Sequence, residues 1–220
     1  MKRTIILDVD GTLMDTNYLH VEAWARAFQK YELPIPRAAI HRQIGKGSTL
    51  MLEELLNDAS LRPEASEWHS HFFTDLQQYG RALPGAKEMI EELFSQEMAI
   101  WFATSAKSEE LDYYLDKLEA HEKLAGIVTS DDVEHGKPAP HIFQQALERS
   151  ASSPDESIVV GDTIWDIQAS RGCGLQTIAV LTGGAFSRQE LQEAGAVAIY
   201  EHCGELLATG FPQTFPSPSS

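Results

Sequence analysis

The sequence has 220 residues, 43% of them hydrophobic, and its 33 acidic and 17 basic side chains give a formal net charge of -16 at pH 7. This length predicts one large domain or a core with a modest insert, and the hydrophobic fraction excludes a wholly disordered chain. The negative charge disfavours nucleic acid and anionic membranes as partners, because both require clustered lysine and arginine. The two cysteines, Cys173 and Cys203, form no CxxC pattern and therefore predict neither a disulfide scaffold nor a thiolate zinc site.

The apolar run near the N-terminus is short and ends at Asp8. It is too short for a signal peptide or a membrane-spanning helix. We therefore expect a cytoplasmic protein that is a monomer or a homodimer and that binds neither nucleic acid nor membrane.

Short apolar runs alternate along the chain with segments of helical spacing. Because strands that alternate with helices form βαβ units, the pattern predicts a doubly wound α/β fold with a parallel sheet. The predicted strands cover residues 5–7, 99–103, 126–128, 158–160 and 177–180, with a weaker sixth at 197–200. The apolar faces predicted for the helices between them are Met89, Ile90, Leu93 and Phe94; Leu111, Tyr114, Leu115 and Leu118; and Ile142, Phe143, Ala146 and Leu147.

The alternation is interrupted between the first two strands. Residues 16–81 contain helical patterns and no strand run, which predicts a helical cap inserted after the first strand. The predicted α/β core therefore consists of residues 1–15 and 82–210. Residues 211–220 are rich in proline and serine and are predicted to form a frayed tail.

Two of the predicted strands end in aspartates. Asp8 and Asp10 follow the first strand, and Asp162 and Asp166 follow the strand at 158–160. Because ligands of open parallel sheets bind beyond the carboxyl ends of the strands, all four side chains are expected at one edge. A cation would remove the repulsion between them, and hard oxygen ligands suit Mg²⁺. An acidic turn at Asp8 and a helix N-cap at Asp162 are the simpler alternatives.

Two further segments carry groups that bind phosphate. Thr104 and Ser105 follow a predicted strand and precede a helix expected from about Ser108, so a hydroxyl and free N–H groups would be available there. Lys137 is followed by Pro138, which stiffens the backbone that carries its ammonium group. The alternatives are an ordinary helix cap and a surface charge.

Taken in order, these motifs resemble those of the haloacid dehalogenase-like hydrolase superfamily, in its capped phosphatase branch. The resemblance covers nearly the whole chain, and its nearest subfamilies are phosphoglycolate-phosphatase-like and β-phosphoglucomutase-like proteins. It rests on Asp8-Val9-Asp10-Gly11-Thr12, Thr104-Ser105, Lys137-Pro138, and Gly161-Asp162 with Asp166.

The resemblance implies a role for each of these groups. Asp8 would be the nucleophile that forms an aspartyl-phosphate, and Asp10 would be the general acid and base. Mg²⁺ would be bound by Asp8, by the backbone carbonyl of Asp10 and by Asp162, with Asp166 as a supporting carboxylate. Phosphate oxygens would be held by Thr104, Ser105 and Lys137.

The predicted cap contains candidate residues for substrate recognition. Lys46 and Ser48 lie in a glycine-rich segment that faces the active site in related capped enzymes, and His20 lies near the catalytic aspartates in mutase-like members. A solvated lysine at a helix start and a packing role for His20 are the alternatives. Since residues 16–81 hold eight acidic and seven basic side chains, the cap is nearly neutral, and its bases are expected to help admit a phosphate.

The sequence therefore predicts a Mg²⁺-dependent phosphatase that acts on a small phosphorylated metabolite. A β-phosphoglucomutase-like sugar-phosphate mutase is the alternative. A non-catalytic metal- or phosphate-sensing module is disfavoured because the chain retains Asp8, Asp10 and Lys137.

Overall fold

A parallel six-stranded sheet forms the centre of the molecule in the computed structural model, which describes residues 3–213. The strand order is β3-β2-β1-β4-β5-β6, so β1 lies between β2 and β4 where the winding direction reverses. This is the position at which an α/β sheet opens a crevice for a ligand. The strands are β1 (Thr4–Leu7), β2 (Ala99–Ala103), β3 (Gly126–Val128), β4 (Ser157–Gly161), β5 (Gln176–Val180) and β6 (Ala198–Tyr200).

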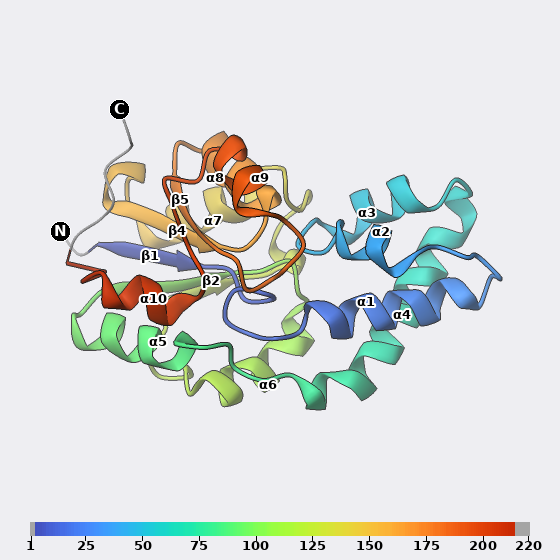
Figure 1. The fold of residues 1–220 in the computed structure, drawn as a ribbon, viewed down its shortest axis with the longest axis horizontal. Helices are drawn as coiled ribbons and strands as arrows, with labels where there is room; N and C mark the ends of the chain where they lie inside the picture. Colours follow the sequence, from blue (N-terminus) through green and yellow to red (C-terminus); the bar gives the residue numbers. More distant parts are fainter. Residues whose placement is uncertain (1–2, 214–220) are drawn as a thin grey trace.

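Helices cover both faces of this sheet (Figure 1), which confirms the predicted doubly wound fold. One face packs against α5 (Ala86–Ser95), α6 (Ser108–Leu118) and α10 (Cys203–Ala208), and the other against α7 (His141–Ser150), α8 (Ile164–Gly172) and α9 (Arg188–Ala194). Short 3₁₀ helices occur at η1 (Ala59–Leu61), η2 (Gln77–Tyr79), η3 (Ser130–Asp132) and η4 (Pro154–Glu156).

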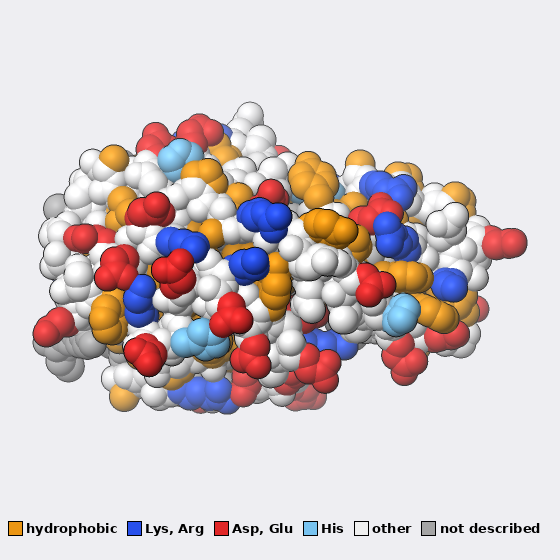
Figure 2. Space-filling model, turned by 90° about the horizontal axis from the view of Figure 1, so that it is seen from below, with side chains coloured by type: hydrophobic (Ala, Val, Ile, Leu, Met, Phe, Trp, Pro, Cys, Tyr) orange, Lys and Arg blue, Asp and Glu red, His pale blue; other side chains and the backbone are white. Residues whose placement is uncertain are grey.

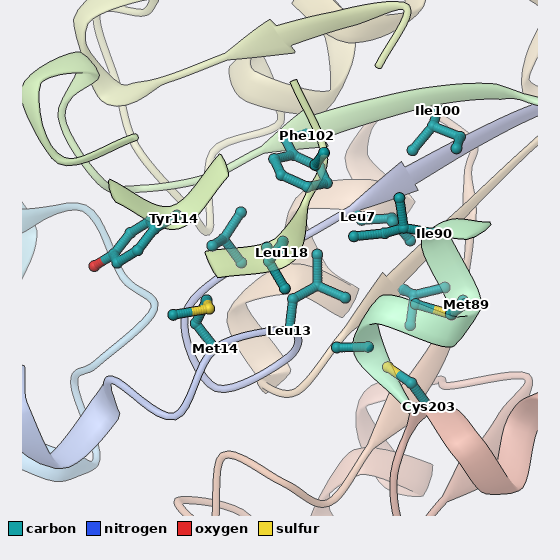
Figure 3. Packing of buried hydrophobic residues seen from close by; sticks show 14 of the residues in the cluster. Leu7, Leu13, Met14, Met89, Ile90, Ile100, Phe102, Tyr114, Leu118 and Cys203 are labelled. Atoms are coloured by element: carbon teal, nitrogen blue, oxygen red, sulfur yellow. The ribbon is translucent and has the colours of Figure 1, made fainter. Parts of the chain in front are cut away.

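The larger apolar cluster reaches the edge of the sheet at which the site lies. Leu13 and Met14, just past β1, pack with Tyr114 of α6 and Phe102 of β2 (Figure 3). The Tyr114 ring lies at the margin of this cluster, with its hydroxyl turned away from the apolar side chains. The loop after β1 is thus fixed by buried apolar contacts.

Two apolar residues lie differently from their prediction. Phe94 is 47% exposed, whereas Met89, Ile90 and Leu93 are fully buried, because α5 turns its last apolar side chain away from the sheet. Phe211 is buried in the larger cluster and Pro212 is buried beside it in the chain, so the prediction of a frayed tail is wrong at these two residues. The rest of that prediction, from residue 214 onward, lies outside the described residues.

Four helices lie between β1 and α5 and form a layer of their own at the end toward which β1 points (Figure 1). They are α1 (Asn17–Gln29), α2 (Arg37–His41), α3 (Ser48–Leu55) and α4 (Arg62–Leu76), and they enclose a separate apolar cluster around Trp24 and Phe28. We call residues 16–81 the cap and the rest the core. The boundaries themselves stay a prediction, although the two connections run side by side, since the Asp15 N–H donates to the Arg81 carbonyl.

Charged side chains of both signs are interspersed over the cap and the core on the face shown in Figure 2. Among residues 3–213, every helix is too short or too polar to cross a membrane. The cytoplasmic location stays a prediction.

Candidate active site

Asp8 directly follows β1 and is held by two partners from different parts of the core. Its Oδ1 lies 2.5 Å from Lys137 Nζ, and its Oδ2 accepts a hydrogen bond of 3.0 Å from Thr12 Oγ1. Lys137 is fully buried and also contacts Asp166 Oδ1 at 2.6 Å and the Ala103 carbonyl at 3.2 Å. The ammonium therefore donates to Asp8 and to the Ala103 carbonyl and forms an ion pair with Asp166.

Asp166 is fixed at the start of α8 by a capping box. Its Oδ2 accepts hydrogen bonds from Thr163 Oγ1 at 2.5 Å and from the Thr163 N–H at 3.1 Å. Thr163 is the N-cap of α8, so the alternative in which Asp162 caps this helix is wrong. With one oxygen bound to the capping residue, Asp166 presents the other to Lys137.

Asp162 is the second buried carboxylate beside Asp8. Its Oδ1 accepts from Thr12 Oγ1 at 3.0 Å, and its Oδ2 accepts from Asn17 Nδ2 at 3.2 Å. Thr12 lies at the same distance from Asp8, but a hydroxyl has one proton and can donate to only one carboxylate at a time. Ligand oxygens of Asp8, Asp162 and Asp166 lie within 4.8 Å of one another.

The charges of this cluster are only partly compensated by protein groups. Burial raises the pKa of Asp8 to about 7; the Lys137 ammonium opposes this shift and the Asp166 carboxylate adds to it. Burial, then the charges of Asp8 and Asp166, raise the pKa of Asp162 well above its usual range. A buried set of oxygen ligands with this excess of negative charge fits a hard divalent cation.

The space beside Asp162 is kept open by glycine. A Cβ added to Gly183 would collide with the Asp162 carboxylate, and one on Gly11 would lie 2.5 Å from Asp162 Oδ2. Gly11 also has φ of +78°, a backbone conformation that other residues rarely adopt. The chain therefore has small residues where the acidic cluster needs access.

Asp10 turns its carboxylate toward the cap instead. Its Oδ1 accepts from Thr16 Oγ1 at 2.5 Å and lies 3.2 Å from His20 Nε2. Burial alone would raise the pKa of Asp10, but the charge and hydrogen bond of His20 and the hydrogen bond of Thr16 lower it overall. Burial alone would lower the pKa of His20, and the Asp10 carboxylate raises it overall. The pair thus favours a proton on His20.

A second histidine of the cap supports His20 from behind. His69 Nε2 lies 3.2 Å from His20 Nδ1, and both rings are buried in a stack that includes Trp24 and Phe73. Burial, then the charges of His20 and Lys107, lower the pKa of His69 well below its usual range. A neutral His69 can accept the Nδ1 proton of His20.

The two hydroxyl residues after β2 already have partners. Thr104 Oγ1 accepts from the Ala106 N–H at 3.1 Å and lies 3.4 Å from Asp10 Oδ2. Ser105 Oγ donates to the Gly45 carbonyl of the cap at 3.1 Å. The structure thus brings the predicted phosphate-binding residues to the same edge as Asp8 and Lys137.

A cavity of about 80 Å³ lies between the core and the cap. Asp8, Asp10 and Ser105 line it from the core. Its cap side includes Lys46 and Ser48, and Ser48 is exposed at its rim. Lys46 is buried: its Nζ lies 2.6 Å from Glu54 Oε1 and 4.1 Å from the centre of the Trp165 ring. Lys46 is therefore not a solvated lysine.

Beside Lys46, the cap touches the segment that carries Lys137. The Gly47 N–H donates to the Lys137 carbonyl at 3.0 Å. A Cβ on Gly47 would lie 2.9 Å from the Cα of Gly136, so the two backbones approach too closely for any larger residue.

Sequence reasoning missed several residues of this site. Four residues that it did not select contact predicted site residues or line the cavity: Asn17, His69, Lys107 and Glu110. The one available signal was the position of Asn17, close behind the first aspartate motif and at the start of a helix. The other three depend on how the cap folds back over the core.

The fold and the site together have the organisation of an enzyme active site, with buried carboxylates at a sheet edge facing a cavity between core and cap. The chain belongs to the haloacid dehalogenase-like hydrolase family, whose model matches residues 5–180. The prediction of a hydrolase of this family is thereby confirmed.

Three similar proteins illustrate this membership. A phosphorylated carbohydrates phosphatase of Thermotoga maritima is 29% identical over 89% of this chain and 92% of its own length. A pyrophosphatase PpaX of Oceanobacillus iheyensis is 25% identical over 81% of this chain and 83% of its own. The crystal structure of a hydrolase from Pseudomonas syringae has a TM-score of 0.89 and 36% identity, covering 94% of this chain and 97% of that one.

Proposed function

We propose that this chain is a Mg²⁺-dependent phosphatase that hydrolyses a small phosphomonoester through an aspartyl-phosphate on Asp8. The observation that carries the proposal is the setting of Asp8: a carboxylate held by Lys137 and Thr12, at the wall of a cavity and beside Asp162. Membership of a hydrolase family and relatives named as phosphatases support it.

Asp8 and Asp10 divide the chemistry between them. An Asp8 oxygen attacks phosphorus, the ester P–O bond breaks, and the departing alkoxide takes a proton from Asp10. Asp10 then takes a proton from a water molecule, whose oxygen attacks the phosphorus and breaks the bond to Asp8. Inorganic phosphate leaves and Asp8 is restored. His20, 3.2 Å from Asp10 Oδ1, holds a proton that can pass to Asp10 before the ester bond breaks and return to His20 after Asp10 has taken the proton of the water.

Positive charge around the phosphate comes from Lys137 and the metal ion. Mg²⁺ would be held by Asp8, Asp162 and the Asp10 carbonyl, and when bound it neutralises phosphate oxygens. Lys137 contributes a fixed ammonium to the same task, and Asp166 keeps that ammonium in place. Thr104 and Ser105 supply hydroxyl and N–H groups for the phosphate at the end of β2.

The cap completes the binding site for the rest of the substrate. Lys46 and Ser48 line the cavity and are our candidates for substrate recognition, together with His20. One buried water molecule needs a cavity volume of at least about 10–15 Å³. A cavity of about 80 Å³ therefore has room for a small metabolite and not for a polymer.

The proposal is tested by assaying phosphate release from a panel of phosphorylated sugars, polyols and acids, with Mg²⁺ or with a chelator. We expect turnover that needs Mg²⁺ and that falls at least about 10³-fold in Asp8→Asn, because a covalent mechanism has no substitute nucleophile. Asp15→Asn is the matched control, since Asp15 is exposed and its variant should retain full activity.

Two results would contradict the proposal. One is substantial phosphate release by Asp8→Asn. The other is isomerisation of β-glucose 1-phosphate by the wild type without release of inorganic phosphate, which would indicate the mutase instead.

A further inference from the structure

A carboxylate that takes no part in the proposed chemistry lies in the wall of the same cavity. Glu110, in the first turn of α6, lines the cavity with Asp10 and His20. Its Oε2 is buried and has no hydrogen-bond partner, and among residues 3–213 its carboxylate forms no hydrogen bond or ion pair. A carboxylate with one buried oxygen that has no partner is unusual enough to require an explanation.

Helix capping does not provide that explanation. Glu110 is the third residue of α6, the position from which a glutamate normally binds the N-cap N–H. Elsewhere in this chain carboxylates at that position do form capping boxes, at η3, η4, α8 and α9. Glu110 forms none, and the side chain of the N-cap residue Lys107 makes no capping hydrogen bond. Glu110 lines the cavity instead.

Among the described residues, no cationic group of the cavity wall is paired with Glu110, although the charges of His20 and Lys107 act on it from a distance. Lys46 Nζ lies 2.6 Å from Glu54 Oε1, and Lys107 Nζ donates to Ser70 Oγ at 2.9 Å. Both lysines are therefore bound to residues of the cap. The cavity thus offers a substrate one unpaired acceptor that is negatively charged when ionised.

Leaving such a group unpaired costs on the order of 1–3 kcal/mol. Burial accordingly raises the pKa of Glu110 to about 7, with the charge of His20 opposing the shift and that of Asp10 adding to it. A ligand that donates a hydrogen bond to the carboxylate removes this cost, whereas a ligand that brings another carboxylate increases it.

We infer that Glu110 determines substrate specificity by accepting a hydrogen bond from a hydroxyl group of the leaving alcohol. The site then favours phosphorylated polyols and sugars over phosphorylated carboxylic acids. This inference rests on the proposed phosphatase function and adds to it the chemical class of the leaving group.

The test compares kcat/KM for glycerol 3-phosphate and for phosphoglycolate at pH 8, where Glu110 is ionised. We expect the wild type to prefer glycerol 3-phosphate at least about tenfold, and Glu110→Gln to reduce that ratio at least about tenfold. Glu109→Gln is the matched control: Glu109 is in the same helical turn but is exposed, so its variant should keep the wild-type ratio.

Each other outcome contradicts the inference. An unchanged ratio in Glu110→Gln would overturn it, as would a wild-type preference for phosphoglycolate. Faster turnover of phosphoethanolamine than of glycerol 3-phosphate would assign an ammonium donor instead of a hydroxyl. The wild-type ratio needs no variant and remains decisive if Glu110→Gln does not fold. If the wild type releases no phosphate, or if Asp8→Asn releases as much as the wild type, the proposed function fails. If the wild type hydrolyses both substrates equally and Asp8→Asn hydrolyses neither, only the role of Glu110 fails.

Discussion

Asp8 and Glu110 line one cavity, and burial raises the pKa of both to about 7, yet their surroundings differ. Asp8 has an ammonium and a hydroxyl within hydrogen-bond distance, whereas Glu110 has no partner in the described chain. The protein therefore supplies partners for Asp8, the carboxylate that we propose as the nucleophile. Glu110, which we assign to substrate recognition, has no such partner among residues 3–213, and we infer that a hydroxyl group of the substrate supplies it.

Replacing the partner of Asp8 should have the largest effect on stability. Lys137→Met leaves Asp8 and Asp166 buried without their shared ammonium, so the free energy of unfolding should fall by about 3–5 kcal/mol. Urea unfolding with a chelator present measures this. Lys87→Met is the control, because Lys87 forms an exposed ion pair with Glu119 and its loss should matter far less. An equal fall in the free energy of unfolding of Lys137→Met and Lys87→Met would contradict this prediction.

Removing the charge of Glu110 should raise the free energy of unfolding instead of lowering it. Its folded-state pKa of about 7 exceeds the ordinary 4.5, so the folded protein binds this proton more tightly than the unfolded chain does. Stability from this group is therefore present below pH 4.5 and is lost as the pH rises to 7. At pH 8 the free energy of unfolding of Glu110→Gln, measured with urea, should exceed that of the wild type by about 1–3 kcal/mol. The difference should vanish near pH 4.5.

That measurement also has a matched control. Glu109→Gln removes a charge from the same helical turn but from the exposed side. It should show no such gain at pH 8. A Glu110→Gln variant that is no more stable than wild type at pH 8 would mean that the carboxylate is already compensated.

The smallest effect is expected at the cap lysine. Lys46 lines the cavity but is already paired with Glu54, so Lys46→Ala should raise KM only about two- to fivefold and leave kcat nearly unchanged. Lys30→Ala, on an exposed lysine of the same cap, should leave both constants unchanged. A wild-type KM in Lys46→Ala would remove Lys46 from the recognition residues.

Much of the fold and of the catalytic edge was predictable because both depend on local pattern. Apolar runs of strand length fix which residues pair in the sheet, and topology then brings the strand ends together. Asp8, Asp162, Lys137 and Thr104 therefore meet as the sequence indicates.

The cap side of the site depends on contacts between segments far apart in the chain. Glu109 and Glu110 are adjacent and chemically identical, but successive residues of a helix point about 100° apart, and only Glu110 lines the cavity between the core and the cap. His69 likewise becomes a partner of His20 through the packing of α4 against α1. Phe94 and Phe211 show the same limit, since hydrophobicity alone does not tell which phenylalanine is covered.

The hydrogen bond from the Gly47 N–H to the Lys137 carbonyl joins the cap to the residue whose ammonium contacts Asp8. The cap cannot swing away from this edge without breaking that bond and separating two glycines in backbone contact. The cap and the core segment that carries Lys137 are thus held together by their backbones. Any opening of the cap would therefore also disturb the backbone that carries the Lys137 ammonium.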